Sequence, residues 1–153
     1  MNGLSLSRQF LTAHNFVRLK HGELPLMWDR RLARYARRWA QARESDCDLI
    51  HSNGPYGENL FWGGNDDWTP YEIVEKWAEE DRFFNVGNNL CQEGRMCGHF
   101  TQVVWRDTVR VGCGKALCNG GGVFVICSYD PPGNYENESP FGRLFNNGNG
   151  DGA

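Results

Sequence analysis

The stretch CGHFTQVVW at residues 97–105 decides the fold of this chain, together with FVICSYDPPGN at residues 124–134. Each stretch is anchored by a cysteine, and Gly112-Cys113-Gly114 lies between the two. Either stretch alone would be suggestive. In this order on one chain they form a highly specific combination, against which the rest of the sequence can be tested.

Hydrophobic periodicity before these stretches predicts three helices. We expect the first from Ser7 to His21 with Ser7 as its cap, the second after an Asp29 cap, and the third from a Thr69 cap to about Asn85. Short β runs bounded by Gly, Pro or Asn are expected at residues 24–28, 58–62, 110–116 and 122–129. The last two are expected to pair antiparallel across the turn at residues 118–121. Helices and strands in this irregular order indicate an α+β fold rather than a doubly wound sheet.

Length and composition fit a single folded unit. The chain has 153 residues and no internal repeat, with six Trp, nine Phe and five Tyr to build a core. We expect one domain over residues 1–141. Residues 142–153 are rich in Asn and Gly and have too little apolar surface to pack, so we expect a disordered tail there.

Charge narrows the classes of partner. The formal net charge is −3 and the isoelectric point is near 5.8, which leaves no global basic field for nucleic acid. Six arginines gather between Asp29 and Glu44, a pattern typical of a solvated helix face. No apolar run is long enough to span a membrane.

Cysteine content indicates the compartment. Six cysteines without Cys-x-x-Cys spacing suit three disulfides formed under oxidising conditions. We therefore expect a secreted, extracellular protein. The first residues lack the basic start and long apolar stretch of a signal peptide, so we expect the numbered chain to be a mature form with an added initiator Met.

Both quoted stretches resemble signatures of one family. Residues 98–105 resemble the Gly-His-Phe/Tyr-Thr-Gln-Val-Val-Trp signature of the CAP proteins, the superfamily of cysteine-rich secretory proteins, antigen 5 and plant pathogenesis-related class 1 proteins. Residues 127–134 are similar to the family's closing Cys-x-Tyr-x-Pro-x-Gly-Asn motif. The similarity covers roughly residues 5–141 and points to the plant defence branch. It implies a three-layer α-β-α sandwich around a central antiparallel sheet, held together by disulfides.

The pairing of the cysteines follows from the resemblance and not from spacing, since six cysteines allow fifteen pairings. The resemblance implies bridges between Cys47 and Cys118, Cys91 and Cys97, and Cys113 and Cys127. Under that scheme the first bridge closes the longest loop and constrains the unfolded chain most, by about 4 to 5 kcal/mol in the loop-entropy model. The second bridge would hold a short loop directly before His99.

Four polar residues are candidates for one shared site. The apolar face of the third predicted helix also takes in Glu80 and Asp81, and periodicity does not choose between these two carboxylates. The family pattern Trp-x-x-Glu implies Glu80. The resemblance adds His51, Glu58 and His99, and it implies that the four side chains line a central cleft.

Two imidazoles and two carboxylates in one cleft are compatible with three roles. They can bind a divalent metal through neutral imidazole nitrogens, relay protons, or satisfy one another as a structural network. The sequence has no nucleophile elbow and no His-Glu-x-x-His helix, and every cysteine is assigned to a bridge. We therefore expect no enzyme, no required cofactor, and at most weak, exchangeable binding of a metal such as Zn²⁺ by His51 and His99. A metal-dependent hydrolase that uses the four cleft residues is the alternative.

The resemblance also implies partners. Members of the plant branch are secreted, and several bind sterols and inhibit fungi or oomycetes. We therefore expect an antifungal, monomeric defence protein with a sterol or related lipid in an apolar groove. Candidates for the groove lining are Phe61, Trp62, Trp68 and Phe83. A pure recognition module, bound by microbial effectors or receptors through its loops, is a further alternative.

The closing signature carries a second candidate output. Residues 131–141 look like the family's defence-signalling peptide, which would be released by a cut between Asp130 and Pro131. This chain has Phe141 where the family's peptide ends in Tyr, Ser128 where Asn is commoner, and further residues after the motif. The alternative is that residues 131–134 form a terminal turn that locks the last strand.

Overall fold

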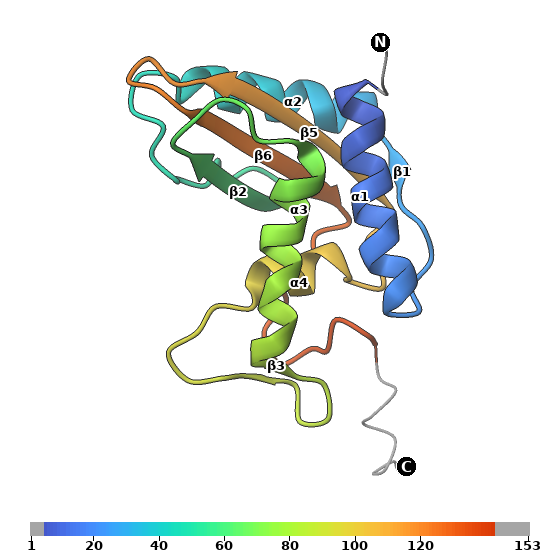
Figure 1. Cartoon of the computed structure of the whole chain (residues 1–153). Coiled ribbons are helices and arrows are strands. Elements are labelled where there is room, and N and C mark those ends of the chain that lie inside the picture. The colour runs from blue at the N-terminus through green and yellow to red at the C-terminus, as the bar shows by residue number, and fades with distance from the viewer. Residues whose placement is uncertain (1–4, 143–153) are drawn as a thin grey trace.

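The computed structural model describes residues 5–142, which form three layers (Figure 1). In chain order the elements are α1 (Leu6–Lys20), β1 (Met27–Trp28), α2 (Arg30–Ala42), β2 (Gly57–Gly63), α3 (Pro70–Ala78), the 3-10 helix η1 (Glu79–Phe83), β3 (Phe84–Asn85), β4 (Leu90–Cys91), α4 (Gly98–Val103), β5 (Arg110–Leu117) and β6 (Val123–Asp130). Helix α2 covers one face of the central sheet, and α1, α3 and α4 lie on the other. The tail expected at residues 142–153 lies outside the described residues, apart from Gly142.

The central sheet has the strand order β1-β5-β6-β2, and its direction is mixed. Strands β5 and β6 are antiparallel across the predicted turn, and β6 is also antiparallel to β2. Edge strand β1 is parallel to β5, so the expectation of a wholly antiparallel sheet is wrong at this edge. Because β1 and β5 are far apart in the sequence, no hairpin imposes an antiparallel pairing on them. The α+β class and the layered architecture are confirmed.

Side-chain caps set where the first two helices begin. Ser5 caps α1, and its side chain accepts a hydrogen bond from the backbone N–H of Arg8. The expected Ser7 cap is therefore wrong by two residues, because both serines precede the same apolar face. Asp29 caps α2 as predicted, accepting hydrogen bonds from two backbone N–H groups of the first turn.

The third helix begins as predicted but ends early. Thr69 and Glu72 form a reciprocal capping box at its start. The α-helix stops at Ala78, where the predicted helix continued to Asn85, and the chain tightens into η1. Phe84 and Asn85 instead pair with β4 in a small two-stranded sheet. This tertiary pairing overrides the helical periodicity of the segment.

Helix α2 lies very close to the sheet because β5 offers glycines beneath it. A Cβ atom on Gly112 would clash with the backbone nitrogen of Ala33, and one on Gly114 would clash with the backbone of Arg37. Ala36 and Ala40 are fully buried on the same side. The contact face of α2 is therefore built from small residues, and its long side chains lie on the outer face.

The central strand β6 is buried on both sides and joins two cores. Phe124 and Ile126 belong to the core under α2, whereas Val125 and Cys127 belong to the larger core formed with α1, α3 and α4. All four of these side chains are fully buried. Burial on both faces explains the almost continuous apolar sequence of this strand. None of the helices within residues 5–142 combines the length and apolar character needed to cross a membrane.

Three disulfides tie the layers together. The bridges join Cys47 to Cys118, Cys91 to Cys97, and Cys113 to Cys127, which is the pairing that the resemblance implied. The first spans 71 residues and fixes the loop after α2 to the end of β5. The second spans six residues directly before α4, and the third links facing positions of β5 and β6. All six cysteines of the sequence take part in these bridges.

Candidate functional site

The four candidate residues form two separate His–Glu pairs. His51 Nδ1 lies 2.8 Å from Glu58 Oε1, and His99 Nδ1 lies 2.7 Å from Glu80 Oε2. Within residues 5–142 no hydrogen bond or ion pair joins one pair directly to the other. The same residues contain no group of three or more His, Cys, Asp or Glu side chains that could hold a metal ion. The donor set is thus smaller than the three protein ligands usual in a catalytic zinc site.

Glu80 acts as the missing cap of helix α4. This short helix has no side-chain cap of its own, since the residue before it is Cys97. Glu80 Oε1 accepts hydrogen bonds from the backbone N–H groups of His99 and Phe100, at 2.9 and 3.0 Å. A carboxylate at this position also faces the positive end of the helix. Asp81, the other carboxylate that periodicity allowed, instead lies 3.9 Å from His21.

Glu58 fixes the loop that carries His51. Its side chain is only 6% exposed. It accepts hydrogen bonds from His51 Nδ1 and from both the backbone N–H and the hydroxyl of Ser52. Tyr35 in turn donates its hydroxyl proton to Ser52 Oγ at 2.7 Å. Since the Ser52 hydroxyl donates to a carboxylate and not to an imidazole, it is not arranged as an activated nucleophile.

The two signature stretches meet at a polar hollow of about 280 Å³ beside His51 and Glu58. Gln102 and Asn134 also line it. Gln102 accepts a hydrogen bond from the backbone N–H of Gly133 at 3.1 Å, which joins the first signature to the second. His99 and Glu80 are not among its lining residues. Gln102 and Asn134 were not among the predicted site residues, although both lie in the two signature stretches.

A buried polar chain links helix α1 to the site. Asn59 Nδ2 donates to the backbone carbonyl of His99 at 3.0 Å and lies 3.3 Å from the Tyr129 hydroxyl. That hydroxyl lies 2.7 Å from His14 Nε2, and His14 Nδ1 lies 2.8 Å from the carbonyl of Phe10. One proton arrangement satisfies all of these groups. His14 Nδ1–H donates to the Phe10 carbonyl, Tyr129 donates to His14 Nε2, and Asn59 donates to Tyr129.

Burial sets the charge state of this chain. The pKa of His14 is lowered to about 4, mainly by burial and in smaller part by the charge of Arg18, against the opposing effect of the hydrogen bond to Phe10. Burial likewise raises the pKa of Tyr129 above its ordinary value. Both groups are therefore neutral at physiological pH. His14 shares the helix face of Phe10, Ala13 and Val17, a spacing that is visible in the sequence, but nothing in the sequence indicates its distant partners.

Comparison with known proteins decides the family. The family model of the cysteine-rich secretory proteins, CAP, matches residues 11–129. This chain belongs to the CAP family. It is 49% identical over 138 residues to the pathogenesis-related protein PR-1 of Medicago truncatula, a match that covers 90% of this chain and 80% of that one. It is 48% identical over 134 residues to pathogenesis-related protein 1A of Nicotiana tabacum, covering 88% and 80%.

Solved structures support the CAP fold. The crystal structure of NaASP2 with Zn²⁺ matches with a TM-score of 0.71 and 23% identity, covering 92% of this chain and 88% of that one. At this level of identity the match concerns the fold alone. The sequence relatives and the family model identify the chain as a CAP protein of the plant PR-1 type.

The closing segment of the CAP domain is held at both ends. The Thr108 hydroxyl donates to the carbonyl of Pro131 at 2.8 Å, and the backbone N–H of Arg106 donates to the carbonyl of Pro140 at 2.7 Å. Phe141 is only 7% exposed, and its ring stacks 6.1 Å from that of His21. The segment that resembles the signalling peptide is therefore part of the folded domain in this structure.

An apolar groove of about 390 Å³ runs between α1 and α3 of the CAP domain. Its lining residues are Thr12, Ala13, Phe16, Val17 and Lys20 from α1, and Tyr71, Val74, Glu75 and Ala78 from α3. Phe16 is 64% exposed and Tyr71 is 43% exposed. The groove shares no residue with the polar hollow beside His51.

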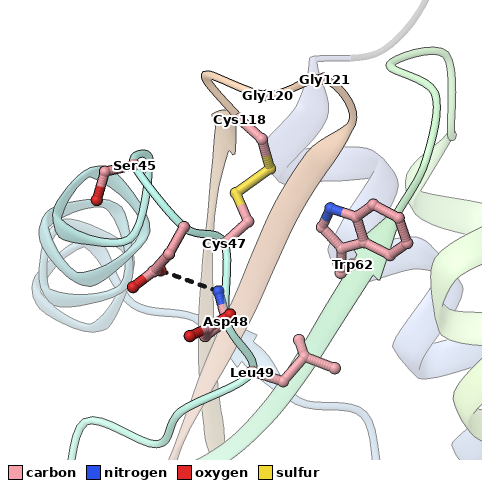
Figure 2. A pocket seen from close by; sticks show the side chains of 9 residues that line it. Ser45, Cys47, Asp48, Leu49, Trp62, Cys118, Gly120 and Gly121 are labelled. Atoms are coloured by element: carbon pink, nitrogen blue, oxygen red, sulfur yellow. Dashed lines mark hydrogen bonds between the residues drawn. A yellow bond between two sulfur atoms is a disulfide. The ribbon is translucent and has the colours of Figure 1, made fainter.

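The aromatic residues expected to line such a groove lie elsewhere. Phe61 and Trp68 pack on each other, with ring centroids 4.9 Å apart. Phe83, the last residue of η1, is half-buried and is flanked by two guanidinium groups. Trp62 lines a different hollow of about 460 Å³, where it lies beside Leu49 and the disulfide of the long loop (Figure 2). None of these four aromatic residues lines the groove between α1 and α3, because their position in loops does not say which helix faces diverge to leave a groove.

Proposed function

We propose that this PR-1-type CAP protein is a defence protein that binds a sterol or a related lipid in the groove between α1 and α3. The observation that carries the proposal is the apolar lining of that groove. Its volume of about 390 Å³ falls within the range of roughly 300 to 1,000 Å³ that is usual for small-molecule sites. Lys20 and Glu75 lie among the lining residues and offer partners for one polar group of a ligand.

Exposed aromatic surface supplies the driving force for binding. Phe16 and Tyr71 are 64% and 43% exposed on two adjacent helices. A ligand that covers them removes apolar area from water, which stabilises the complex by about 25 cal/mol per Å². A sterol suits this groove because it is almost wholly apolar and carries one hydroxyl group.

The proposal is tested by titrating the protein with dehydroergosterol, a fluorescent sterol. Phe16→Asp places a charge in the groove, whereas Leu19→Asp makes the same change on the same helix at a residue that is 75% exposed and does not line the groove. We expect Phe16→Asp to weaken sterol binding at least tenfold, since burying an unpaired charge costs several kcal/mol. Leu19→Asp should bind like the wild type. Equal weakening in both variants, or no sterol binding by the wild type, contradicts the proposal and favours a pure recognition module.

We further propose that the two His–Glu pairs act without catalysis, as structural networks that hold the His51 loop and the start of α4. The support is that Glu58 and Glu80 both accept backbone N–H groups in addition to an imidazole. Binding of Zn²⁺ by His51 and His99 remains a prediction, and on the donor set it is weak. Calorimetric titration with Zn²⁺ and ester hydrolysis with and without chelator test both points. Chelator-sensitive turnover that is lost in His51→Ala/His99→Ala protein would establish the hydrolase instead.

Release of a peptide beginning at Pro131 also remains a prediction. Tyr135 is 54% exposed, so the middle of the segment is open to solvent. A cut after Asp130 would still leave Pro140 and Phe141 attached to the domain. We therefore propose that release needs local opening as well as cleavage. After limited proteolysis, mass spectrometry should detect a chain cut after Asp130 but no free peptide. The free peptide should appear only after mild denaturant is added.

We propose a secreted, extracellular location on the strength of the three disulfides. Non-reducing peptide mapping of protein recovered from the culture medium of plant cells tests this point. Recovery of only reduced protein from the cytosol would contradict it.

A further inference from the structure

Helix α2 carries an unusually basic outer face. We infer that this face binds a linear carboxylated polysaccharide, a polyuronate, through an arginine row. The arginine row consists of Arg30, Arg31, Arg34, Arg37 and Arg38. All five are exposed, and within residues 5–142 none of them forms an ion pair. Other arginines do form such pairs, as Arg106 does with Glu23 at 3.1 Å.

The geometry of the helix gathers the arginine row into one stripe. At 100° per residue, the five positions fall within about 120° of the helix circumference. Their Cα atoms extend about 12 Å along the axis at 1.5 Å per residue. The opposite face cannot compete for a ligand, because it is pressed against Gly112 and Gly114 of β5. The arginine row is thus a narrow, straight, cationic stripe on a firmly held helix.

The arginine row lies where helix stability disfavours positive charge. Arg34 has a like-charged neighbour three or four residues away at each of Arg30, Arg31, Arg37 and Arg38, and like charges at this spacing destabilise a helix. Arg30 and Arg31 also occupy the first turn, at the positive end of the helix dipole. The Asp29 cap offsets only part of this, since Arg110 lies 3.6 Å from the same carboxylate. Charges that oppose local stability point to a ligand outside the helix.

The chemistry of the stripe fits a chain that carries a carboxylate on each unit. Guanidinium groups bind carboxylates through two parallel hydrogen bonds, and a chain with one carboxylate per sugar can meet several of them at once. The stripe offers no exposed large apolar side chain for insertion into a bilayer. Anionic lipids belong mainly to the cytoplasmic leaflet, and nucleic acid is mainly intracellular. The choice of a polyuronate therefore rests on the extracellular location proposed above and is independent of the lipid groove.

The test compares two variants that each lose three positive charges. Arg30→Gln/Arg34→Gln/Arg38→Gln removes the centre and both ends of the row, and Gln keeps a good helix propensity. The control is Lys76→Gln/Arg82→Gln/Arg95→Gln, three exposed residues outside α2. The probe is an oligogalacturonate of about ten sugars, titrated by calorimetry at low and at physiological salt. We expect the row variant to bind about tenfold more weakly, the control to change less than about twofold, and wild-type binding to weaken with salt.

Several outcomes would overturn the inference. These are absence of oligogalacturonate binding by the wild type at low salt, equal loss in both variants, or equal binding of the methyl-esterified, uncharged oligomer. Tighter binding to a DNA duplex or to phosphatidylserine vesicles through the same arginines would assign the stripe to another polyanion. The row variant should melt no lower than the wild type, because like-charge repulsion is removed. Its dehydroergosterol binding should be unchanged, so failure here is distinguishable from failure of the lipid proposal.

Discussion

Acid should destabilise this protein through the buried imidazole of His14. The side chain is fully buried, and burial lowers its pKa from 6.5 to about 4. In the unfolded chain the same ring takes up a proton near pH 6.5, so the unfolded state binds more protons between these two values. The contribution of neutral His14 to the free energy of unfolding is therefore complete above pH 6.5, and it is lost as the pH falls from 6.5 to about 4. At 1.36 kcal/mol per pH unit, the loss is about 3 kcal/mol.

The hydrogen bonds around His14 explain why the folded protein resists this proton. Both ring nitrogens are already used, Nδ1 by the Phe10 carbonyl and Nε2 by the Tyr129 hydroxyl. Protonation of Nε2 would turn an acceptor into a donor, and the Tyr129 proton would then need a new acceptor. Its other neighbour is Asn59 Nδ2, which only donates. Arg18 adds a like charge nearby.

The assay is urea unfolding of the wild type and of His14→Gln at pH 7 and pH 4. The wild type should lose about 3 kcal/mol more unfolding free energy than the variant, because all other titrating groups are shared. NMR titration of the wild type provides a second measurement if the variant does not fold, and the His14 ring should stay neutral at pH 5.5. The reasoning is refuted if that ring titrates near pH 6.5, or if the two proteins lose stability equally.

Three further substitutions have directions fixed by the packing. Gly114→Ala should cost about 2 kcal/mol in urea unfolding because its methyl group meets the backbone of Arg37, and an unchanged midpoint would argue against the close helix–sheet contact. Glu80→Gln should lower the free energy of unfolding by about 2 kcal/mol because it weakens the cap of α4. Its matched control, Asp81→Asn, should lower the same free energy by well under half of that amount. Phe141→Ala should cost about 3 kcal/mol and speed proteolysis after residue 130, and resistance equal to the wild type would show that the ring is not an anchor.

Much of the fold could be predicted because its signals are local. Asp29 and Thr69 bind the nitrogens of their own first turns, so short-range sequence reveals both helix starts. The end of α3 could not be predicted, because Phe84 leaves the helical pattern only to pair with Cys91. The parallel direction of β1 could not be predicted either, because it is set by pairing with Val111 of β5, which is far away in the sequence.

The family resemblance named His51, Glu58, Glu80 and His99 as candidates, but their grouping into two pairs could not be predicted. Periodicity left Glu80 and Asp81 equivalent, and only the η1 turn brings the first to His99 and the second to His21. That α4 has no cap of its own is visible in the sequence, but the residue that caps it lies 19 positions away. Glu58 likewise binds a loop that precedes its strand. The sequence therefore shows which residues are candidates, whereas hydrogen bonds between distant positions determine how these residues pair.

The layered architecture separates the two binding surfaces that we propose. The groove lies between α1 and α3 on one side of the sheet, and the arginine row lies on α2 on the other side. Between them, β5 meets the α2 backbone through Gly112 and Gly114, and the Cys113–Cys127 bridge joins β5 to β6. Elements packed this closely resist a change in their relative position, so binding of a ligand on one side has little conformational change to drive. Within residues 5–142 the two surfaces are separated by this closely packed layer, and we therefore expect them to act independently.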